Sequence, residues 1–371
     1  MLSNRVRRRS FRLWAGLALL LTLTAEPAAA DPAGPSGFVQ RDGTRLVLDG
    51  QPYVFTGLNI YNAATWSGTC WYPMAGDALD ASLTAIGPGE EAFRAWFFQY
   101  EATVAGHRDW TSFDRTLAVA RVHGVKVIPV LVDQWGNCEG WPDAGSGYKN
   151  EAWYREGYRT RPTGPGLPAA YRDWVAEVVT RYRDDPTVLA WQLVNEAEAG
   201  TSLTGDCPDT ATASLVGFAT DMAALVKSID PNHLLSLGSI GSGQCGMDGD
   251  GYQTVHAVPG IDLCEYHDYG DPADPVPGDE WNGMAVRIAQ CAELGKPLFT
   301  GELGLRPDEA DGTLAGRAAL LDAKVRGQLA AGSVGVLAWD WRDAAHGGSA
   351  LDGYEIGPDD PALSVLANVY T

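Results

Sequence analysis

Residues 188–194 read Val-Leu-Ala-Trp-Gln-Leu-Val, and Asn195 and Glu196 follow them directly. A short run this apolar, without alternating polar residues, is typical of a strand that is buried on both faces of a parallel sheet. Seven similar runs occur along the chain, and longer stretches with helical periodicity lie between most of them. The eight candidate strands are residues 53–58, 93–97, 125–132, 188–194, 234–237, 261–266, 298–300 and 334–339.

The intervals between these runs predict helices, some of which end at a glycine such as Gly124 or Gly332. Strands that alternate with helices are typical of an α/β fold with a parallel sheet. The count of eight favours closure into a single (β/α)8 TIM barrel over an open, doubly wound sheet. The candidate helices are residues 110–123, 169–183, 211–229, 285–294, 313–331 and 360–370.

Ahead of the first candidate strand, residues 37–49 contain two β-type runs on either side of Asp42-Gly43. An Asp-Gly pair between such runs predicts a tight turn and therefore a short N-terminal β-hairpin. We expect this hairpin to close the bottom of the barrel.

Residues 1–30 have the composition of a secretory signal peptide rather than of a folded segment. Five arginines precede an apolar run over residues 13–23, and Ala28-Ala29-Ala30 supplies a small-residue cleavage site. We therefore expect residues 1–30 to be a signal peptide, residues 31–371 to form one domain, and the protein to be secreted and extracellular. The apolar run is too short to span a bilayer, so an uncleaved membrane anchor is the weaker alternative.

The chain is acidic, with a formal net charge of −20. Removal of residues 1–30 takes away five Arg and one Glu, which brings the charge to about −24. Such a protein repels phosphate backbones and anionic lipid surfaces, so we expect neither nucleic acid nor a membrane as a partner. We further expect a neutral substrate and a monomeric protein.

The six cysteines are an even number, and their spacing matches no zinc-binding pattern. In an exported chain this predicts disulfides, for which six cysteines allow fifteen pairings. We expect no metal or other cofactor, but a calcium site near residues 248–250 stays open as an alternative. The favoured pairing joins neighbouring loops or elements and is Cys70–Cys138, Cys207–Cys245 and Cys264–Cys291.

The carboxyl ends of the strands form the active site of a (β/α)8 barrel, so polar residues at these positions are candidates for function. Two carboxylates, a cation, an imidazole, a phenol, two amides and two indoles fall there. This set suits cleavage of a glycosidic bond, because one carboxyl group can protonate the leaving oxygen while the other acts at the anomeric carbon. The candidates are Asn59, Arg94, Trp135, Asn195, Glu196, His267, Tyr269, Glu302 and Trp339.

Three motifs at predicted strand ends are residues 190–196 (Ala-Trp-Gln-Leu-Val-Asn-Glu), 267–269 (His-Asp-Tyr) and 300–304 (Thr-Gly-Glu-Leu-Gly). In this order they resemble the acid/base motif, the motif after the sixth strand and the nucleophile motif of glycoside hydrolase family 5. This family belongs to the clan that contains the cellulases and β-mannanases. The similarity is greatest to the fungal- and plant-type endo-β-1,4-mannanases, which residues 57–61 and 131–135 also resemble.

The resemblance implies a retaining glycoside hydrolase that acts on a polysaccharide or oligosaccharide, with β-mannan favoured, and that needs no cofactor. Glu196 would be the acid/base and Glu302 the nucleophile of a double displacement. Burial of Glu196 would raise its pKa and let it act as an acid near neutral pH. The implied substrate-binding residues are Arg94, Asn195, His267, Tyr269, Trp339, Asn59 and Trp135.

The chain departs from the family pattern at three places near these motifs. Ala197 stands where the family usually has a proline after the acid/base residue. Asp133-Gln134 stands where mannanases tend to have two asparagines, and Gly270 stands where they tend to have a proline. These departures concern loop residues, which decide the sugar that fits.

Other functions therefore stay open beside the endo-β-1,4-mannanase. A β-1,4-glucanase or an exo-acting glycosidase of the same family would keep both glutamates, and a non-catalytic saccharide-binding protein would use the cleft without chemistry. Exo action would be favoured if long loops closed the cleft into a pocket. These loops are residues 136–168, 198–209 and 239–253.

Overall fold

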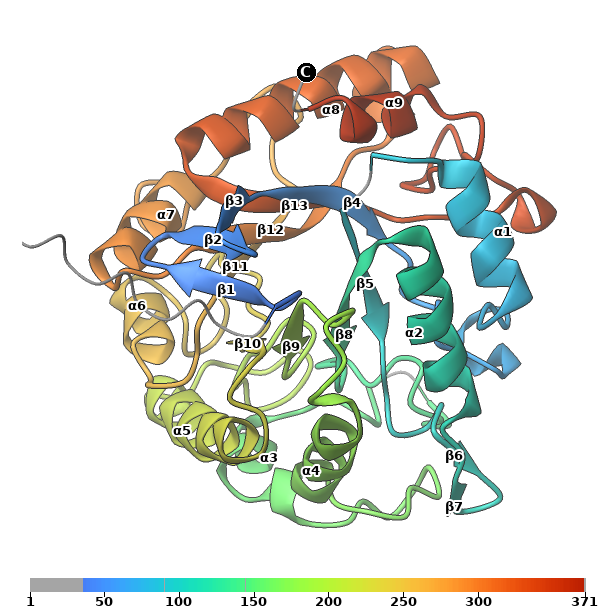
Figure 1. Cartoon of the computed structure of the whole chain (residues 1–371). Helices are drawn as coiled ribbons and strands as arrows, with labels where there is room; N and C mark the ends of the chain where they lie inside the picture. The colour runs from blue at the N-terminus through green and yellow to red at the C-terminus, as the bar shows by residue number, and fades with distance from the viewer. Residues whose placement is uncertain (1–35, 90, 144, 370–371) are drawn as a thin grey trace, which may run out of the picture. The chain divides into compact units, whose positions relative to one another are not determined.

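The computed structural model describes residues 36–89, 91–143 and 145–369, so the predicted signal peptide lies outside the described residues. Its centre is a sheet of eight parallel strands, which correspond to the eight predicted runs (Figure 1). The strands are β4 (Phe55–Asn59), β5 (Ala92–Trp96), β8 (Lys126–Val130), β9 (Ala190–Gln192), β10 (Leu234–Ser236), β11 (Cys264–Asp268), β12 (Leu298–Gly304) and β13 (Ser333–Trp339).

The order of the strands in this sheet is β10-β9-β8-β5-β4-β13-β12-β11, and every pair is parallel. A parallel bridge between Ser236 and Leu263 joins the two outermost strands. The sheet is therefore closed, and the predicted (β/α)8 barrel is confirmed.

Helices surround the strands on the outside, as Figure 1 shows. All six predicted helices are present, but α1, α3 and α6 were not predicted. The segment that forms α6 was expected to be loop up to residue 253; it is helical because Tyr252 and His256 are buried against the barrel. The helices are α1 (Asp77–Ile86), α2 (Thr111–His123), α3 (Glu151–Arg155), α4 (Tyr171–Tyr182), α5 (Ala211–Ile229), α6 (Asp250–His256), α7 (Met284–Glu293), α8 (Leu314–Ala331) and α9 (Pro361–Ala367).

Shorter elements lie in the connecting loops. They are the strands β6 (Thr103–Val104) and β7 (His107–Arg108) and the 3-10 helices η1 (Gly68–Cys70), η2 (Gly157–Arg159), η3 (Pro307–Glu309) and η4 (Ala344–His346).

Among the described residues, α5 is the one helix that is long and apolar enough to cross a membrane. Its Leu215, Phe218 and Met222 are buried in the barrel core. The apolar character of α5 is therefore explained by packing in the helical layer.

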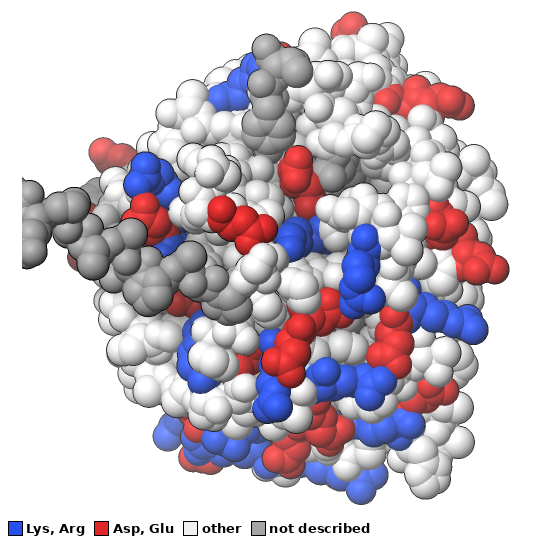
Figure 2. Space-filling view, viewed as in Figure 1, with Lys and Arg blue, Asp and Glu red and all other residues white. Residues whose placement is uncertain are grey.

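The predicted N-terminal hairpin is present as β1 (Val39–Asp42) and β2 (Arg45–Leu48), and β3 (Gln51–Tyr53) extends it to three antiparallel strands. Val39 and Leu46 pack against residues at the start of the barrel strands, such as Phe55 and Ala92. The small sheet thus closes the bottom of the barrel and lies in front of it in Figure 1. In Figure 2, acidic and basic side chains are interspersed on this face rather than segregated.

The three predicted disulfides are all present. Cys70–Cys138 ties the loop after β4 to the loop after β8, and Cys207–Cys245 ties the loop after β9 to the loop after β10. Cys264–Cys291 joins β11 to α7. The first two bridges therefore fasten loops at the carboxyl ends of the barrel strands.

We expect the double change Cys70→Ser, Cys138→Ser to lower the free energy of unfolding by about 2–4 kcal/mol, because the bridge restricts the unfolded chain. Cys138 lines the cleft described below, so the KM should rise as well. The double change Cys264→Ser, Cys291→Ser serves as the matched control, since it should lower the melting temperature without raising the KM. Equal effects of the two double variants on the KM would contradict this prediction.

Candidate active site

A cleft of about 780 Å³ opens at the carboxyl ends of the barrel strands. Segments that follow different strands contribute to its walls, so distant parts of the sequence meet there. Three predicted site residues, Asn59, Arg94 and His267, lie behind the cleft wall and are buried. The predicted residues that line the cleft are Trp135, Asn195, Glu196, Tyr269, Glu302 and Trp339.

The two candidate catalytic glutamates approach each other across the barrel mouth. Glu302 lies on β12, in register with His267 of the neighbouring β11. Glu196 follows β9 and has a φ of 61°, a strained backbone conformation of the kind found at active sites. One oxygen of each carboxylate and one nitrogen of His267 lie within 4.8 Å of one another. Retaining glycosidases keep their two carboxyl groups about 5–5.5 Å apart, so this arrangement suits a double displacement.

The carboxylate of Glu302 is held by two donors. Arg94 Nη1 donates to Oε1 at 2.8 Å, and Tyr269 Oη donates to Oε2 at 2.6 Å. Gly304 makes room for the tyrosine, since a Cβ atom there would lie 2.2 Å from Tyr269 Cε1. Burial raises the pKa of Glu302, whereas His267, Arg94 and Tyr269 act to lower it. These three partners therefore favour the ionised form that a nucleophile needs.

The carboxylate of Glu196 has different partners. Trp135 Nε1 donates to Oε2 at 2.6 Å, and His267 Nδ1 lies 2.9 Å from Oε1. Burial acts to raise the pKa of Glu196, but the contacts with His267 and Trp135 outweigh it and lower the pKa. The expectation of a raised pKa is therefore wrong, because a cation lies next to the carboxylate.

This cation is His267, which is buried among three carboxylates. Its Nδ1 lies 2.9 Å from Glu196 and 3.5 Å from Glu302, and its Nε2 lies 3.2 Å from Glu265. Burial alone would lower the pKa of His267, but Glu302, Glu196 and Glu265 raise it to about 10. Because Glu196 and Glu302 share one cation, their protonation steps belong to the pair rather than to either residue.

Sequence reasoning missed Glu265, although a signal was available. Glu265 stands two residues before His267 on β11, and alternate residues of a strand share a face. It also accepts a hydrogen bond from Ser236 Oγ at 2.8 Å and lies 3.8 Å from Arg94 Nε. The buried Glu265 therefore places a negative charge next to the cationic side chains of Arg94 and His267.

Arg94 connects Glu302 with the rest of the site. Its Nη2 donates to Asn195 Oδ1 at 2.6 Å, and its Nη1 also donates to Asn59 Oδ1 at 3.0 Å. Asn195 Nδ2 donates in turn to Asp133 Oδ1 at 2.8 Å, so the asparagine next to Glu196 is fixed at both ends. Asn59 was predicted to bind substrate, but its side chain is fully buried beneath Arg94. Asn59 Nδ2 donates to Gly301 O at 2.9 Å, so the amide of Asn59 is held among the barrel strands.

The departures from the family pattern have local structural reasons. The amide of Ala197 donates to Gly238 O at 2.8 Å, and the amide of Gly270 donates to Asp268 Oδ1 at 3.0 Å. A proline could make neither bond, because it has no N–H group. Asp133 accepts a second hydrogen bond, from the amide of Asn137. Its pKa is raised to about 7 by burial and by Glu139.

We expect the change His267→Asn to move the pH profile of kcat/KM to higher pH. Loss of the cation raises the pKa values of both Glu196 and Glu302, so the acidic and the basic limb should both shift by about one pH unit or more. The measurement is kcat/KM between pH 4 and 9 on soluble β-mannan. The control is His123→Asn, which removes a surface histidine paired with Asp80. An unchanged pH profile of kcat/KM in His267→Asn would contradict the positive charge assigned to His267.

Aromatic rings form the wall of the cleft on the β4 and β13 side. Trp339 stacks on Tyr61 at a centroid distance of 5.5 Å and lies 6.0 Å from Trp96. Of the two tryptophans at the end of β13, Trp339 lines the cleft and Trp341 is buried. Farther along, the side chain of Trp71 is 72% exposed. Tyr61 and Trp96 end predicted strands, whereas Trp71 was not predicted as a site residue; it follows η1, and only the folding of this loop brings it to the cleft.

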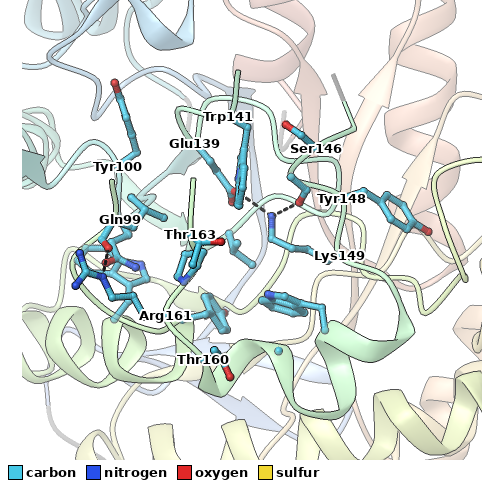
Figure 3. A pocket seen from close by; sticks show the side chains of 18 of the residues that line it. Gln99, Tyr100, Glu139, Trp141, Ser146, Tyr148, Lys149, Thr160, Arg161 and Thr163 are labelled. Carbon is cyan, nitrogen blue, oxygen red and sulfur yellow. Dashed lines mark hydrogen bonds and ion pairs between the residues drawn. The ribbon is translucent and has the colours of Figure 1, made fainter. Parts of the chain in front are cut away.

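A second cavity of about 350 Å³ lies behind the loop that follows β8, and Figure 3 shows its side chains. Lys149 Nζ points toward Glu139 and donates to its Oε2 at 2.7 Å. Glu139 Oε1 accepts the amide hydrogen bond of Asp133, and Oε2 also accepts from Trp141 Nε1. The polar groups of this cavity thus hydrogen-bond to one another. Through Glu139 they also hold Asp133, which in turn accepts a hydrogen bond from Asn195.

Within the described residues, one group of three side chains lies close enough together to bind a metal ion: Glu196, His267 and Glu302. These are the groups on which glycosidic cleavage would depend. A cationic His267 offers no lone pair to a metal, so the electrostatics of the group suit proton transfer better than metal binding.

Comparisons with known proteins agree with this geometry. A family model described as "GH family 5 beta-mannosidase-like" matches residues 173–325. "Mannan endo-1,4-beta-mannosidase 1" of Oryza sativa subsp. japonica is 32% identical over 317 residues, which cover 73% of this chain and 69% of that protein. The chain belongs to glycoside hydrolase family 5.

Other relatives of this family 5 enzyme carry similar names. "Mannan endo-1,4-beta-mannosidase F" of Aspergillus fumigatus is 28% identical over 76% of this chain and 67% of that protein. The endo-1,4-beta-mannanase of Rhizomucor miehei has the same fold, with a TM-score of 0.65, 19% identity, and coverage of 89% of this chain and 97% of that chain. An endo-beta-1,4-mannanase of Thermotoga petrophila gives a TM-score of 0.62 at 20% identity, over 85% and 76% of the two chains. The family 5 enzyme is thus a glycosyl hydrolase with the barrel fold of these proteins.

Proposed function

We propose that this family 5 enzyme is a secreted, retaining endo-β-1,4-mannanase with Glu302 as nucleophile and Glu196 as acid/base. The observation that carries the proposal is the pair of carboxylates within 4.8 Å, of which only Glu302 contacts Arg94 and Tyr269. Arg94 and Tyr269 stabilise negative charge on Glu302. The double displacement requires the proton on Glu196, although the neighbouring His267 lowers the pKa of Glu196 in the substrate-free site.

In the first step Glu302 attacks the anomeric carbon, and the bond to the leaving sugar breaks as Glu196 transfers its proton to the leaving oxygen. The product of this step is a glycosyl ester of Glu302 with the opposite anomeric configuration. In the second step Glu196 accepts a proton from water, whose oxygen attacks the anomeric carbon and releases Glu302. Two inversions leave the configuration unchanged, and both glutamates return to their starting forms.

Two observations support internal cleavage of a mannan chain. Aromatic side chains from two loops also line the cleft beside the carboxylates: Trp135 follows β8 and Trp71 follows β4. Among the described residues that line the cleft, Asn137 and Cys138 come from loop 136–168, and none comes from loops 198–209 and 239–253. These two loops therefore do not close the cleft, whose 780 Å³ has room for more than one sugar ring. The names of the relatives support mannan as the substrate.

The three disulfides support secretion, because such bonds persist in oxidising compartments. We retain a monomeric protein, without a nucleic-acid or membrane partner, as part of the proposal. Its acidic net charge of −20 suits an uncharged polysaccharide.

The test is an assay of the purified protein on β-mannan, carboxymethyl cellulose, xylan and aryl glycosides, with the products resolved by size. Oligosaccharides of several lengths from mannan, released first as the β-anomer, would support the proposal. Strong release from cellulose alone would assign a glucanase, and release of single sugars alone would assign an exo-glycosidase.

A further inference from the structure

Asp340 follows Trp339 at the end of β13, and within the described residues no hydrogen bond joins its side chain to Glu196 or Glu302. The residue is 5% exposed, and it lines the cleft. Among the described residues, the only hydrogen bond to its carboxylate comes from its own backbone amide. A buried carboxyl group with so few partners is costly unless a ligand supplies the missing hydrogen bonds.

The groups that face Asp340 come from every side of this end of the cleft. Glu355 and Arg342 belong to the C-terminal segment, Glu302 to β12, and Tyr61 to the segment after β4. Burial and Glu355 raise the pKa of Asp340 to about 7, while Arg342 acts to lower it. Arg342 Nη2 binds Glu355 Oε1 at 2.7 Å, so its charge is already shared.

Glu355 adds an independent sign that polar ligand groups belong here. It lines the cleft, and its Oε2 is buried without a hydrogen-bond partner in the described part of the chain. Two neighbouring carboxyl groups thus have hydrogen-bonding capacity that the protein does not fill. A sugar ring next to them presents hydroxyl groups, which can donate to a carboxylate and accept from a carboxylic acid.

We propose that Asp340 is a specificity-determining residue that binds hydroxyl groups of the sugar ring lying against Trp339, with Glu355 beside it. The proposal rests on the proposed function, because it places the ring by the nucleophile and Trp339. Trp339 contacts the apolar face of the ring and Asp340 its polar edge, which fixes the rotation of the sugar over the wall. Asn195 follows β9, across the barrel from β13, so Asn195 and Asp340 would bind hydroxyl groups on different edges of the same ring.

The test compares Asp340→Ala and Asp340→Asn with the parent enzyme on aryl β-mannobiosides. Asp340→Ala should lower kcat/KM by about 10- to 100-fold, since a hydrogen bond to a charged group is lost. Asp340→Asn keeps the shape and some hydrogen bonding, so its loss should be smaller. Asp359→Asn, an exposed carboxylate outside the cleft, is the matched control, and the melting temperature of each variant checks its folding.

Substrates that lack one hydroxyl group, at C3 or C6 of the ring next to the aryl group, separate sugar binding from a structural role. With the parent enzyme, one of these analogues should have a lower kcat/KM than the full substrate. This loss should equal the loss of kcat/KM that Asp340→Ala causes on the full substrate. The variant should not discriminate between that analogue and the full substrate. Equal discrimination by the parent and the variant would overturn the proposal. If the parent cleaves glucosides but not mannosides, the proposed function fails, and the matching deoxy-glucosides test Asp340 separately.

Discussion

The change Glu302→Gln is expected to lower kcat on β-mannan by about 10⁴-fold or more, because removal of a nucleophile abolishes the covalent route. Glutamine keeps the size of the side chain and can still contact Arg94 and Tyr269, so the fold should be retained. The measurement is release of reducing sugar by the parent and the variant at equal concentration. The exposed Glu280, changed to glutamine, is the matched control. Loss of less than tenfold would assign the nucleophile to another residue.

The variant Glu302→Ala gives a second test of the same role. Its shortened side chain leaves room for azide, which can attack the anomeric carbon of an activated aryl β-mannobioside in place of the carboxylate. Attack opposite to the leaving group yields the α-glycosyl azide, with one inversion and with Glu196 still available as the acid. Formation of the β-azide by this variant would contradict the assignment.

The change Glu196→Ala is expected to lower kcat on β-mannan by about 10²- to 10⁴-fold, the usual contribution of a general acid or base. On a 2,4-dinitrophenyl β-mannobioside the loss in the first step should be small, since this leaving group needs no proton. The second step lacks its base, so the glycosyl ester of Glu302 should accumulate and give a burst of dinitrophenol. The measurement is stopped-flow absorbance.

Azide distinguishes this residue from the nucleophile. In Glu196→Ala it should restore turnover by attacking the glycosyl ester without base catalysis, and the product should be the β-glycosyl azide. Glu198→Ala is the control, because Glu198 lies two residues further on and binds Tyr148 outside the catalytic pair. Equal losses on mannan and on the dinitrophenyl substrate would contradict an acid/base role.

The barrel was predictable because its signals are local. Runs such as residues 188–194 are apolar along their whole length, which is a property of strands buried on both faces. The polar residues that end these runs then fall at one rim, whatever the loops do. This is why the strand-end positions of Glu196 and Glu302 could be predicted, although Asn59, Arg94 and His267 lie behind the cleft wall rather than on it.

Other features could not be predicted because they depend on contacts distant in sequence. The helix α6 forms where Tyr252 and His256 meet the barrel, and Trp71 reaches the cleft through a loop held by Cys70–Cys138. The pKa of Glu196 depends on His267, which is 71 residues away.

By itself, the sequence determined the fold class, the catalytic candidates and the family motifs, because hydrophobic periodicity and the residue types at strand ends are properties of short segments. Only the tertiary structure decided the electrostatics of the pair, the place of Asn59 behind Arg94 and the burial of Asp340 beside Trp339. The reason is physical: charge, burial and hydrogen-bonding depend on which side chains meet in space, and a closed barrel brings together residues from all eight strands.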